Sequence, residues 1–176
     1  MLNRKMLKPS NLLFAIVLLF VVSTRLPQIL EHIKLEGQPL IQEERRNILE
    51  NQTIIFPPSA GHAMVIYWAT WCAPCKLEMN RLKSSVESGA IPKERIFAVS
   101  LFEEESEVQS FLQKNPYPFI FLALSKNDES LNIRATPTTL IVQDGKIRSI
   151  SQGMSLWGIW WAEFLFKNHL EMQQTK

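Results

Sequence analysis

The chain has 176 residues, of which 46% are hydrophobic and 20% charged, and its formal net charge is +2. This length and composition fit one globular domain with an N-terminal extension, and they exclude a chain that is disordered throughout. Without Arg4, Lys5 and Lys8 the remaining 16 basic and 17 acidic residues leave a net charge of −1. That balance excludes a strongly basic nucleic-acid-binding protein, so no nucleic-acid partner is expected.

Residues 1–24 are typical of a membrane-targeting segment. The three basic residues precede an apolar run over 12–22, and no charge occurs in the 16 residues from Pro9 to Thr24. As a helix this stretch would be about 24 Å long, shorter than a hydrocarbon core of ~30 Å. The segment is therefore expected to be an uncleaved signal-anchor, extended beyond Arg25, or a cleaved signal peptide; a core helix is the remaining alternative. Both leading alternatives place the rest of the chain outside the cytoplasm, because the basic flank stays inside.

Residues 25–37 are expected to form a juxtamembrane linker, which ends at the helix-breaking sequence Gly37-Gln38-Pro39. A folded domain over 38–170 and a tail over 171–176 are predicted to follow. Within the domain, the charged residues 43–50 are expected to form a short surface helix.

The domain alternates apolar runs that fit buried strands with segments of helical periodicity. Strands are predicted over 63–69, 96–101 and 119–124, helices from Ala73 to before Gly89 and over 103–113 and 128–133, and a hairpin over 138–150 with its turn at Asp144-Gly145. Parallel strands need helical crossovers, whereas a hairpin adds antiparallel strands. The order therefore predicts an α/β fold in which helices flank a central mixed sheet.

A closing helix is predicted from its N-cap, Ser155, to about His169. Its aromatic and aliphatic side chains recur at helical spacing, which is typical of a face packed against a sheet. These residues are Trp157, Trp160, Trp161, Phe164 and Leu165.

The only two cysteines, Cys72 and Cys75, flank Ala73 and Pro74 where the first strand gives way to a helix. A disulfide across so short a loop constrains the unfolded chain little, which favours a reactive role over a structural one. Cys72 is expected just before the first helical turn, where unpaired N–H groups and the helix dipole stabilise a thiolate. Pro74 suits that turn because it has no N–H to lose, and Cys75 is expected on the buried face. Cys72 is thus the predicted nucleophile, and Cys75 is predicted to resolve the mixed disulfide.

A metal site is the alternative explanation for two cysteines at this spacing. Zinc would need two further ligands, and the histidines His32, His62 and His169 show no matching spacing. Neither a metal nor an organic cofactor is therefore expected, and the redox centre is the cysteine pair itself.

Residues 68–75, Trp-Ala-Thr-Trp-Cys-Ala-Pro-Cys, resemble the active site of thioredoxin-like proteins. Residues 135–138, Ala-Thr-Pro-Thr, resemble the cis-proline segment of the same fold. With a membrane signal ahead of the domain, the chain resembles the TlpA/ResA group of membrane-anchored extracytoplasmic thiol–disulfide oxidoreductases. The segment 153–161 is similar to ScsD-type proteins, which are named for the suppression of copper sensitivity. The resemblance covers roughly residues 38–170 and implies a thioredoxin fold.

The resemblance also implies a catalytic role for Glu78, because that group has an active-site glutamate at this position. A half-buried carboxylate there would exchange a proton with Cys75 during resolution. Ile66 stands where cytosolic thioredoxins have a buried aspartate, which leaves proton transfer to Glu78 or to water. The alternative is a solvated glutamate that pairs with Arg81 or Lys83.

Six residues are expected to bind substrate or to support the structure around the cysteine pair. Pro137 is predicted to follow a cis peptide bond, which would set the backbone of Thr136 beside the disulfide for a substrate strand to bind. An ordinary trans turn is the alternative. Trp68 is expected to pack around the site, and Ala73 and Pro74 are the other residues expected to support the site's structure. Trp71 is expected to be partly exposed for contact with a partner.

The sequence therefore predicts an extracytoplasmic oxidoreductase that exchanges disulfides with protein substrates. The resemblance implies a reductase that is fed by a membrane electron-transfer partner and serves cytochrome c or copper-site maturation. A disulfide-forming oxidase of Dsb type remains open, as does a low-turnover module that binds clients beside Pro137. The predicted location is the inner membrane, with a single pass and the domain in the periplasm, or the periplasm itself after signal cleavage.

Overall fold

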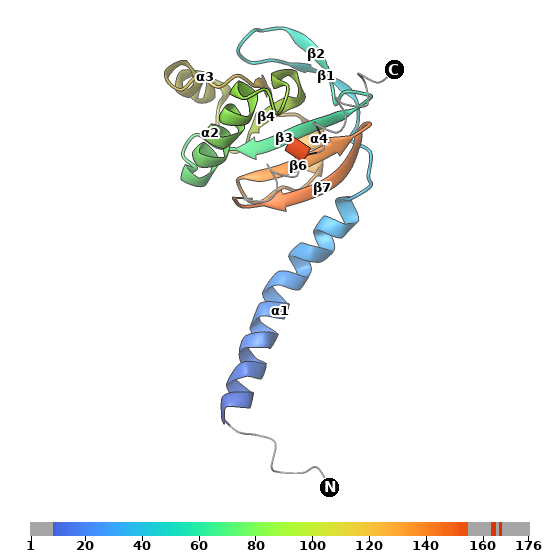
Figure 1. Ribbon diagram of the computed structural model, residues 1–176, viewed down its shortest axis with the longest axis vertical. Helices are drawn as coiled ribbons and strands as arrows, with labels where there is room; N and C mark the ends of the chain where they lie inside the picture. The colour runs from blue at the N-terminus through green and yellow to red at the C-terminus, as the bar shows by residue number, and fades with distance from the viewer. Residues whose placement is uncertain (1–8, 155–162, 165, 167–176) are drawn as a thin grey trace. The chain divides into compact units, whose positions relative to one another are not determined.

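The computed structural model describes residues 9–154, 163, 164 and 166 (Figure 1). The chain divides into two units, Met1–Leu35 and Glu36–Lys176. In the first unit, helix α1 spans Pro9–Leu35, and the large apolar side chains of its segment 12–22 are exposed. Among the described residues, none of the helices meets the combined length and hydropathy of a membrane span. The division falls close to the predicted linker, but the domain boundaries themselves stay a prediction.

The second unit is built on a five-stranded sheet with the order β5-β4-β3-β6-β7. Its strands are β3 (His62–Trp68), β4 (Ile96–Ser100), β5 (Ile120–Leu122), β6 (Thr138–Gln143) and β7 (Lys146–Gln152). The pairs β3–β4 and β4–β5 are parallel, whereas β3–β6 and β6–β7 are antiparallel. This confirms the predicted mixed sheet and its strand–helix alternation.

Helices α2 (Ala73–Glu87) and α3 (Glu105–Lys114) lie on the same side of the sheet in Figure 1. A 3₁₀ turn, η2 (Lys93–Arg95), leads into β4, and α4 (Lys126–Ser130) follows β5. Every residue of β3 is buried, as a central strand requires. Its alternate side chains Met64, Ile66 and Trp68 join one core cluster with the buried faces of α2 and α3. Successive side chains of a strand point to opposite faces of the sheet, so this set of β3 side chains faces helix α2.

The β6–β7 turn forms at Asp144-Gly145, as predicted. Both residues have positive φ, +50° and +74°, which a two-residue hairpin of type I′ requires. The Asp144 side chain also accepts a hydrogen bond from the N–H of Gly61 at 2.8 Å. The turn thus ties the hairpin to the loop that precedes β3.

The predicted surface helix over 43–50 is wrong. Strand β1 (Glu43–Arg46) pairs antiparallel with β2 (Thr53–Phe56), and Asn51 takes a positive φ of 52° in the turn between them. Arg45 is the buried residue of β1 and lies between exposed neighbours, which is the period of a strand. Tertiary contacts of Arg45 override the helical preference of this charged stretch.

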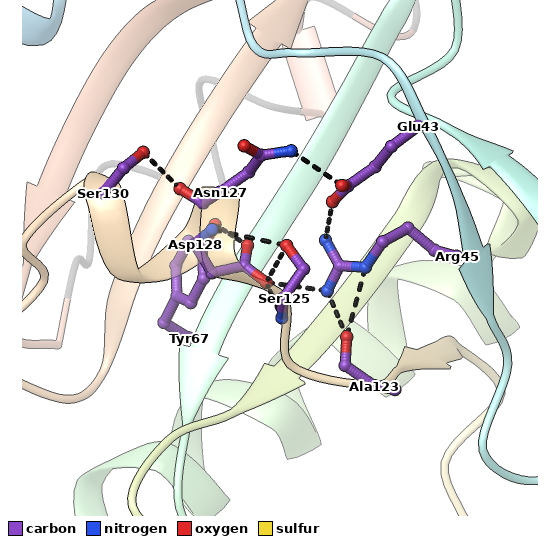
Figure 2. Close-up of polar contacts among 8 residues, drawn as sticks. All are labelled: Glu43, Arg45, Tyr67, Ala123, Ser125, Asn127, Asp128 and Ser130. Atoms are coloured by element: carbon purple, nitrogen blue, oxygen red, sulfur yellow. Dashed lines mark hydrogen bonds and ion pairs between the residues drawn. The ribbon is translucent and has the colours of Figure 1, made fainter.

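Arg45 is buried because it meets an acid from a distant part of the chain (Figure 2). Its Nη2 lies 2.7 Å from Oδ2 of Asp128, and both side chains are at most 4% exposed. Asp128 also accepts a hydrogen bond from the hydroxyl of Tyr67 at 2.8 Å and forms a capping box with Ser125 at the start of α4. Burial, and next the Asp128 carboxylate, raise the pKa of Tyr67 well above its ordinary value. This buried cluster joins β1, β3 and α4.

The N-terminal segment of the second unit also pairs with both edge strands of the sheet, with β5 and with the start of β7. At the β5 edge, the N–H of Ile48 donates to the carbonyl of Phe121 at 2.8 Å, and that of Ala123 donates to Arg46 at 3.0 Å. At the β7 edge, the N–H of Leu40 donates to the carbonyl of Gly145 at 2.9 Å. Backbone groups that an open edge would expose are therefore paired within the chain.

Most of the predicted closing helix lies outside the described residues, including its N-cap Ser155, the three tryptophans and Leu165. Of its described positions, Phe164 is exposed, whereas Phe166 is buried in the core cluster of α2 and α3.

Candidate active site

The cysteine pair lies where β3 passes into α2, as the sequence predicts. Cys72 is the N-cap of α2, and its Sγ accepts a hydrogen bond from the N–H of Cys75 at 3.2 Å. The two sulfur atoms form a disulfide, with Cα atoms 5.3 Å apart. Pro74 stands in the first turn, where no intrahelical partner is lost. A sulfur anion at Cys72 would thus meet an N–H donor and the positive end of the helix.

The two cysteines differ in their access to solvent. Cys72 is 5% exposed, whereas Cys75 is fully buried on the stripe that continues through Met79 and Leu82. Ala73 and Pro74, between the cysteines, are both exposed. An incoming sulfur can therefore approach Cys72 from the surface, while Cys75 faces the core.

Trp68 closes the core behind the disulfide. It is fully buried, and its ring contacts Phe111 of α3 and Phe121 of β5, with centroids 5.6 and 5.8 Å away. Trp68 belongs to the same core cluster as Cys72 and Cys75, and its structural role at the site stays a prediction.

The peptide bond between Thr136 and Pro137 is cis, as predicted. Thr138 pairs with Tyr67 in the β3–β6 register, so residues 136–137 lie at the end of the sheet where β3 runs into the cysteine loop. Pro137 is buried, and its carbonyl accepts a hydrogen bond from the N–H of Gly153 at 2.7 Å. The two motifs that the sequence separates by some sixty residues thus share one end of the sheet.

Exposed apolar side chains occur on the loops at this end of the sheet. Trp71 is 64% exposed, in agreement with the prediction. Phe102 is 67% exposed in the loop after β4, and Met154 is 53% exposed just after β7. The sequence analysis missed Phe102 and Met154, because hydrophobicity alone does not distinguish a loop residue that faces solvent from one that faces the core.

Glu78 is buried, with 1% of its surface exposed, on the same helix as Cys75 and one turn later. Side chains three residues apart on a helix are neighbours, with Cβ atoms about 5–6 Å apart. The Oε2 atom of Glu78 lies 3.8 Å from Nη1 of Arg81, which is half-exposed. The solvated alternative is therefore wrong, although the Arg81 pairing that it included is present as a long contact.

Glu103 is a second carboxylate near the cysteines, and the sequence analysis missed it. Its Oε2 accepts hydrogen bonds from the N–H of Thr70 and from the hydroxyl of Ser100, each at 2.7 Å. Its Oε1 accepts a further hydrogen bond from the hydroxyl of Thr70. The acidic run 103–105 gives no sequence signal for which of its members turns toward the active-site loop.

Within the described ranges, no group of three or more histidine, cysteine, aspartate or glutamate side chains is arranged to hold a metal ion. His62, one of the histidines weighed as a ligand, packs against Phe166 with ring centroids 5.9 Å apart. The expectation that the protein needs no metal and no cofactor stays a prediction.

No known family model matches the chain. Its curated relatives are thiol–disulfide oxidoreductases. Sporulation thiol-disulfide oxidoreductase A of Bacillus subtilis is 23% identical over 111 residues, which cover 60% of this chain and 67% of that protein. Thiol-disulfide oxidoreductase ResA of Oceanobacillus iheyensis is 34% identical over 94 residues, 51% of this chain and 48% of the relative. The chain thus spans about half the length of that relative.

The fold is also found in solved structures. The crystal structure of StoA from Bacillus subtilis matches with a TM-score of 0.58 at 21% identity, over 73% of this chain and 98% of that one. The thio-disulfide isomerase from Thermus thermophilus matches with the same TM-score, 0.58, and 21% identity over 74% of this chain and 96% of that one. The chain is therefore a relative of the thiol–disulfide oxidoreductases named StoA and ResA, and it has a thioredoxin-like fold.

Proposed function

We propose that this protein exchanges disulfides with protein substrates through Cys72 and Cys75 and acts as a reductase. The observation that carries the proposal is the unequal placement of the two sulfurs. Cys72 caps a helix and keeps 5% of its surface exposed, whereas Cys75 is fully buried one turn further on. The named activity of the curated relatives supports the same chemistry.

In the proposed reaction, the Cys72 thiolate attacks a substrate disulfide and forms a mixed disulfide while one substrate thiolate leaves. Cys75 then loses its proton and attacks Sγ of Cys72, which closes the Cys72–Cys75 disulfide and releases the second substrate thiol. Two electrons pass from the pair to the substrate. A membrane electron-transfer partner that carries a dithiol would return the pair to the reduced form. Thr136, Pro137 and the exposed ring of Trp71 would hold the substrate strand during the exchange.

A redox titration of the full chain against glutathione tests this proposal. As a reductase, the pair should have a reduction potential nearer the ~−270 mV of thioredoxin than the ~−120 mV of strong disulfide-forming oxidants. A value near the oxidant end would favour the Dsb-type alternative. A pair that never exchanges with glutathione would contradict the oxidoreductase function and favour a client-binding module.

We assign Glu78 the role of proton acceptor for Cys75 in the resolving step. Replacing it with glutamine keeps the shape of the side chain but removes its ability to take the proton. The reduced E78Q variant should resolve mixed disulfides about tenfold more slowly or worse, and its pH–rate profile should move to higher pH because water must replace the carboxylate. Stopped-flow reaction with a small aromatic disulfide measures both quantities.

The matched control for this experiment is Glu87→Gln, because Glu87 is an exposed glutamate at the end of the same helix. It should leave both rate and profile unchanged. An E78Q variant that loses stability but resolves mixed disulfides at the normal rate would contradict the proposed role.

We further propose that the N-terminal segment anchors the protein in the inner membrane and leaves the thioredoxin-like unit in the periplasm. Arg4, Lys5 and Lys8 before the apolar segment 12–22 of α1 support this orientation. Membrane fractionation should recover the intact chain only with detergent. Recovery of a shorter, soluble chain would show signal cleavage instead, and recovery of the intact chain without detergent would contradict the anchor.

The substrates are proposed to be cysteine-bearing proteins of cytochrome c or copper-site maturation. This class is what the resemblance to the TlpA/ResA group implies, and partners trapped by the variant described in the Discussion test it. If those partners contain neither haem-binding nor copper-binding cysteines, the substrate class is wrong.

A further inference from the structure

The Glu103 side chain links the loop before Cys72 to the end of the neighbouring strand, β4. Glu103 follows β4, and its two carboxylate oxygens accept both donors of Thr70, the backbone N–H at 2.7 Å and the hydroxyl. The same carboxylate accepts the Ser100 hydroxyl at 2.7 Å. A single carboxylate therefore satisfies three donors, two of which belong to a residue two positions before the nucleophile.

The surrounding backbone explains why this position matters. Trp68 is paired with Ser100 at the end of the parallel β3–β4 ladder, and the N–H of Leu101 donates to the carbonyl of Trp68 at 2.9 Å. Beyond that point the chain leaves the sheet and turns, and the N–H of Cys72 donates back to the carbonyl of Ala69 at 3.1 Å. The contacts of Thr70 with Glu103 continue the link between the two strands into this turn.

We infer that Glu103 is a positioning residue for the Cys72 sulfur, an inference that rests on the proposed exchange function. By holding Thr70, the Glu103 carboxylate fixes the turn that places Cys72 at the N-cap of α2. At the N-cap, the sulfur accepts the N–H of Cys75 and meets the positive end of the helix. Glu103 thus stabilises the Cys72 thiolate indirectly, through geometry.

A carboxylate suits this arrangement because it accepts from all three donors at once. Both of its oxygens accept, whereas a glutamine at the same place has one accepting oxygen and an amide group that donates. With glutamine only one oxygen accepts, the Thr70 hydroxyl must turn its proton away to receive the amide group, and every hydrogen bond loses the strengthening that the negative charge provides. The variant E103Q should therefore loosen the turn while it keeps the size of the side chain.

The sign of the effect separates positioning from a simple charge effect. A negative charge near a thiol raises the pKa of the thiol, so removing the charge alone would lower it. Loss of the N-cap position has the opposite effect, because the thiolate loses its hydrogen bond and its favourable place on the helix dipole. For E103Q we therefore expect the pKa of the Cys72 thiol to rise by about one unit, a tenfold loss of thiolate at neutral pH.

The test is an ultraviolet titration of the thiolate in the reduced full chain, with wild type and E103Q compared. A rise in the pKa supports the inference. A fall, as expected from charge alone, or an unchanged value, as expected from a purely structural residue, would overturn it. The exposed neighbour Glu104 provides the matched control, since E104Q removes the same charge one position away and should leave the pKa unchanged.

A second variant keeps the inference testable if E103Q does not fold. Thr70→Val removes the hydroxyl donor but keeps both the Glu103 charge and the backbone N–H of Thr70. It should raise the pKa of Cys72 by a smaller amount than E103Q, and an unchanged or lowered pKa in T70V alone would overturn the inference. Where E103Q does fold, the effects of the two substitutions together should be less than additive. Additive effects would mean that the two residues act separately and would overturn the inference.

The glutathione titration of the wild type separates this inference from the proposed function. A wild-type pair that does not exchange contradicts the function itself. A wild type that exchanges normally, beside an E103Q variant with an unchanged pKa, contradicts only the role of Glu103.

Discussion

Replacing Cys75 with serine should convert the protein into a trap for its substrates. Cys72 would still attack a substrate disulfide, but the group that displaces the substrate would be absent, so the mixed disulfide would persist. Cells that carry C75S should accumulate higher-mass species on non-reducing gels that disappear when a thiol reductant is added. Mass spectrometry of those species identifies the partners.

The matched variant for this experiment is Cys72→Ser, which keeps the fully buried thiol of Cys75 and removes the thiol at the helix N-cap. Since Cys75 is fully buried whereas Cys72 caps the helix, C72S should trap nothing and should lose turnover entirely. Equal trapping by the two variants would contradict the assignment of Cys72 as the nucleophile. Trapping by neither would count against exchange with proteins.

Replacing Asp128 with asparagine should destabilise the protein by about 3 kcal/mol, because the buried Arg45 guanidinium loses its fully buried counter-charge and keeps only the partly exposed carboxylate of Glu43, 3.3 Å away. The change also weakens the hydrogen bond from Tyr67 and the capping box with Ser125 at the start of α4. Urea unfolding of the full chain followed by circular dichroism measures the loss.

The adjacent arginine provides an internal control for this prediction. Arg46 pairs with Glu105 at 2.5 Å, but the two side chains are 44% and 35% exposed. An ion pair in water contributes about 1 kcal/mol at most, so Arg46→Met should have a small effect, whereas Arg45→Met should approach the loss seen for D128N. If R45M and R46M lose similar amounts of unfolding free energy, the claim that burial makes the Arg45 ion pair the more stabilising one is wrong.

The motifs of the redox site could be read from the sequence because each has a local physical cause. Cys72 and Pro74 suit the start of a helix, and the spacing of Cys75, Met79 and Leu82 marks its buried face. The strand β3 was equally clear, since a continuous apolar run fits a strand buried on both sides. Local pattern thus predicted the sheet, the active-site helix and the position of both sulfurs.

The contacts that the sequence did not reveal are those between distant residues. The segment 43–50 was assigned to a helix because nothing near Arg45 indicates a partner that lies 83 residues later, at Asp128. The role of Glu103 was hidden in the same way, because its contact with Thr70 depends on the parallel alignment of β3 with β4. Charged residues at strand positions are therefore the least predictable part of this fold.

The segment from Gly37 to Ile48 has a consequence for how the protein behaves among other chains. Its backbone hydrogen bonds to β5 and to the start of β7 occupy places where a foreign strand would otherwise add. An unpaired sheet edge can add a strand from an incompletely folded polypeptide, and this pairing leads to aggregation. By pairing with β5 and with the start of β7, this segment leaves fewer edge positions at which a foreign strand could add to the sheet.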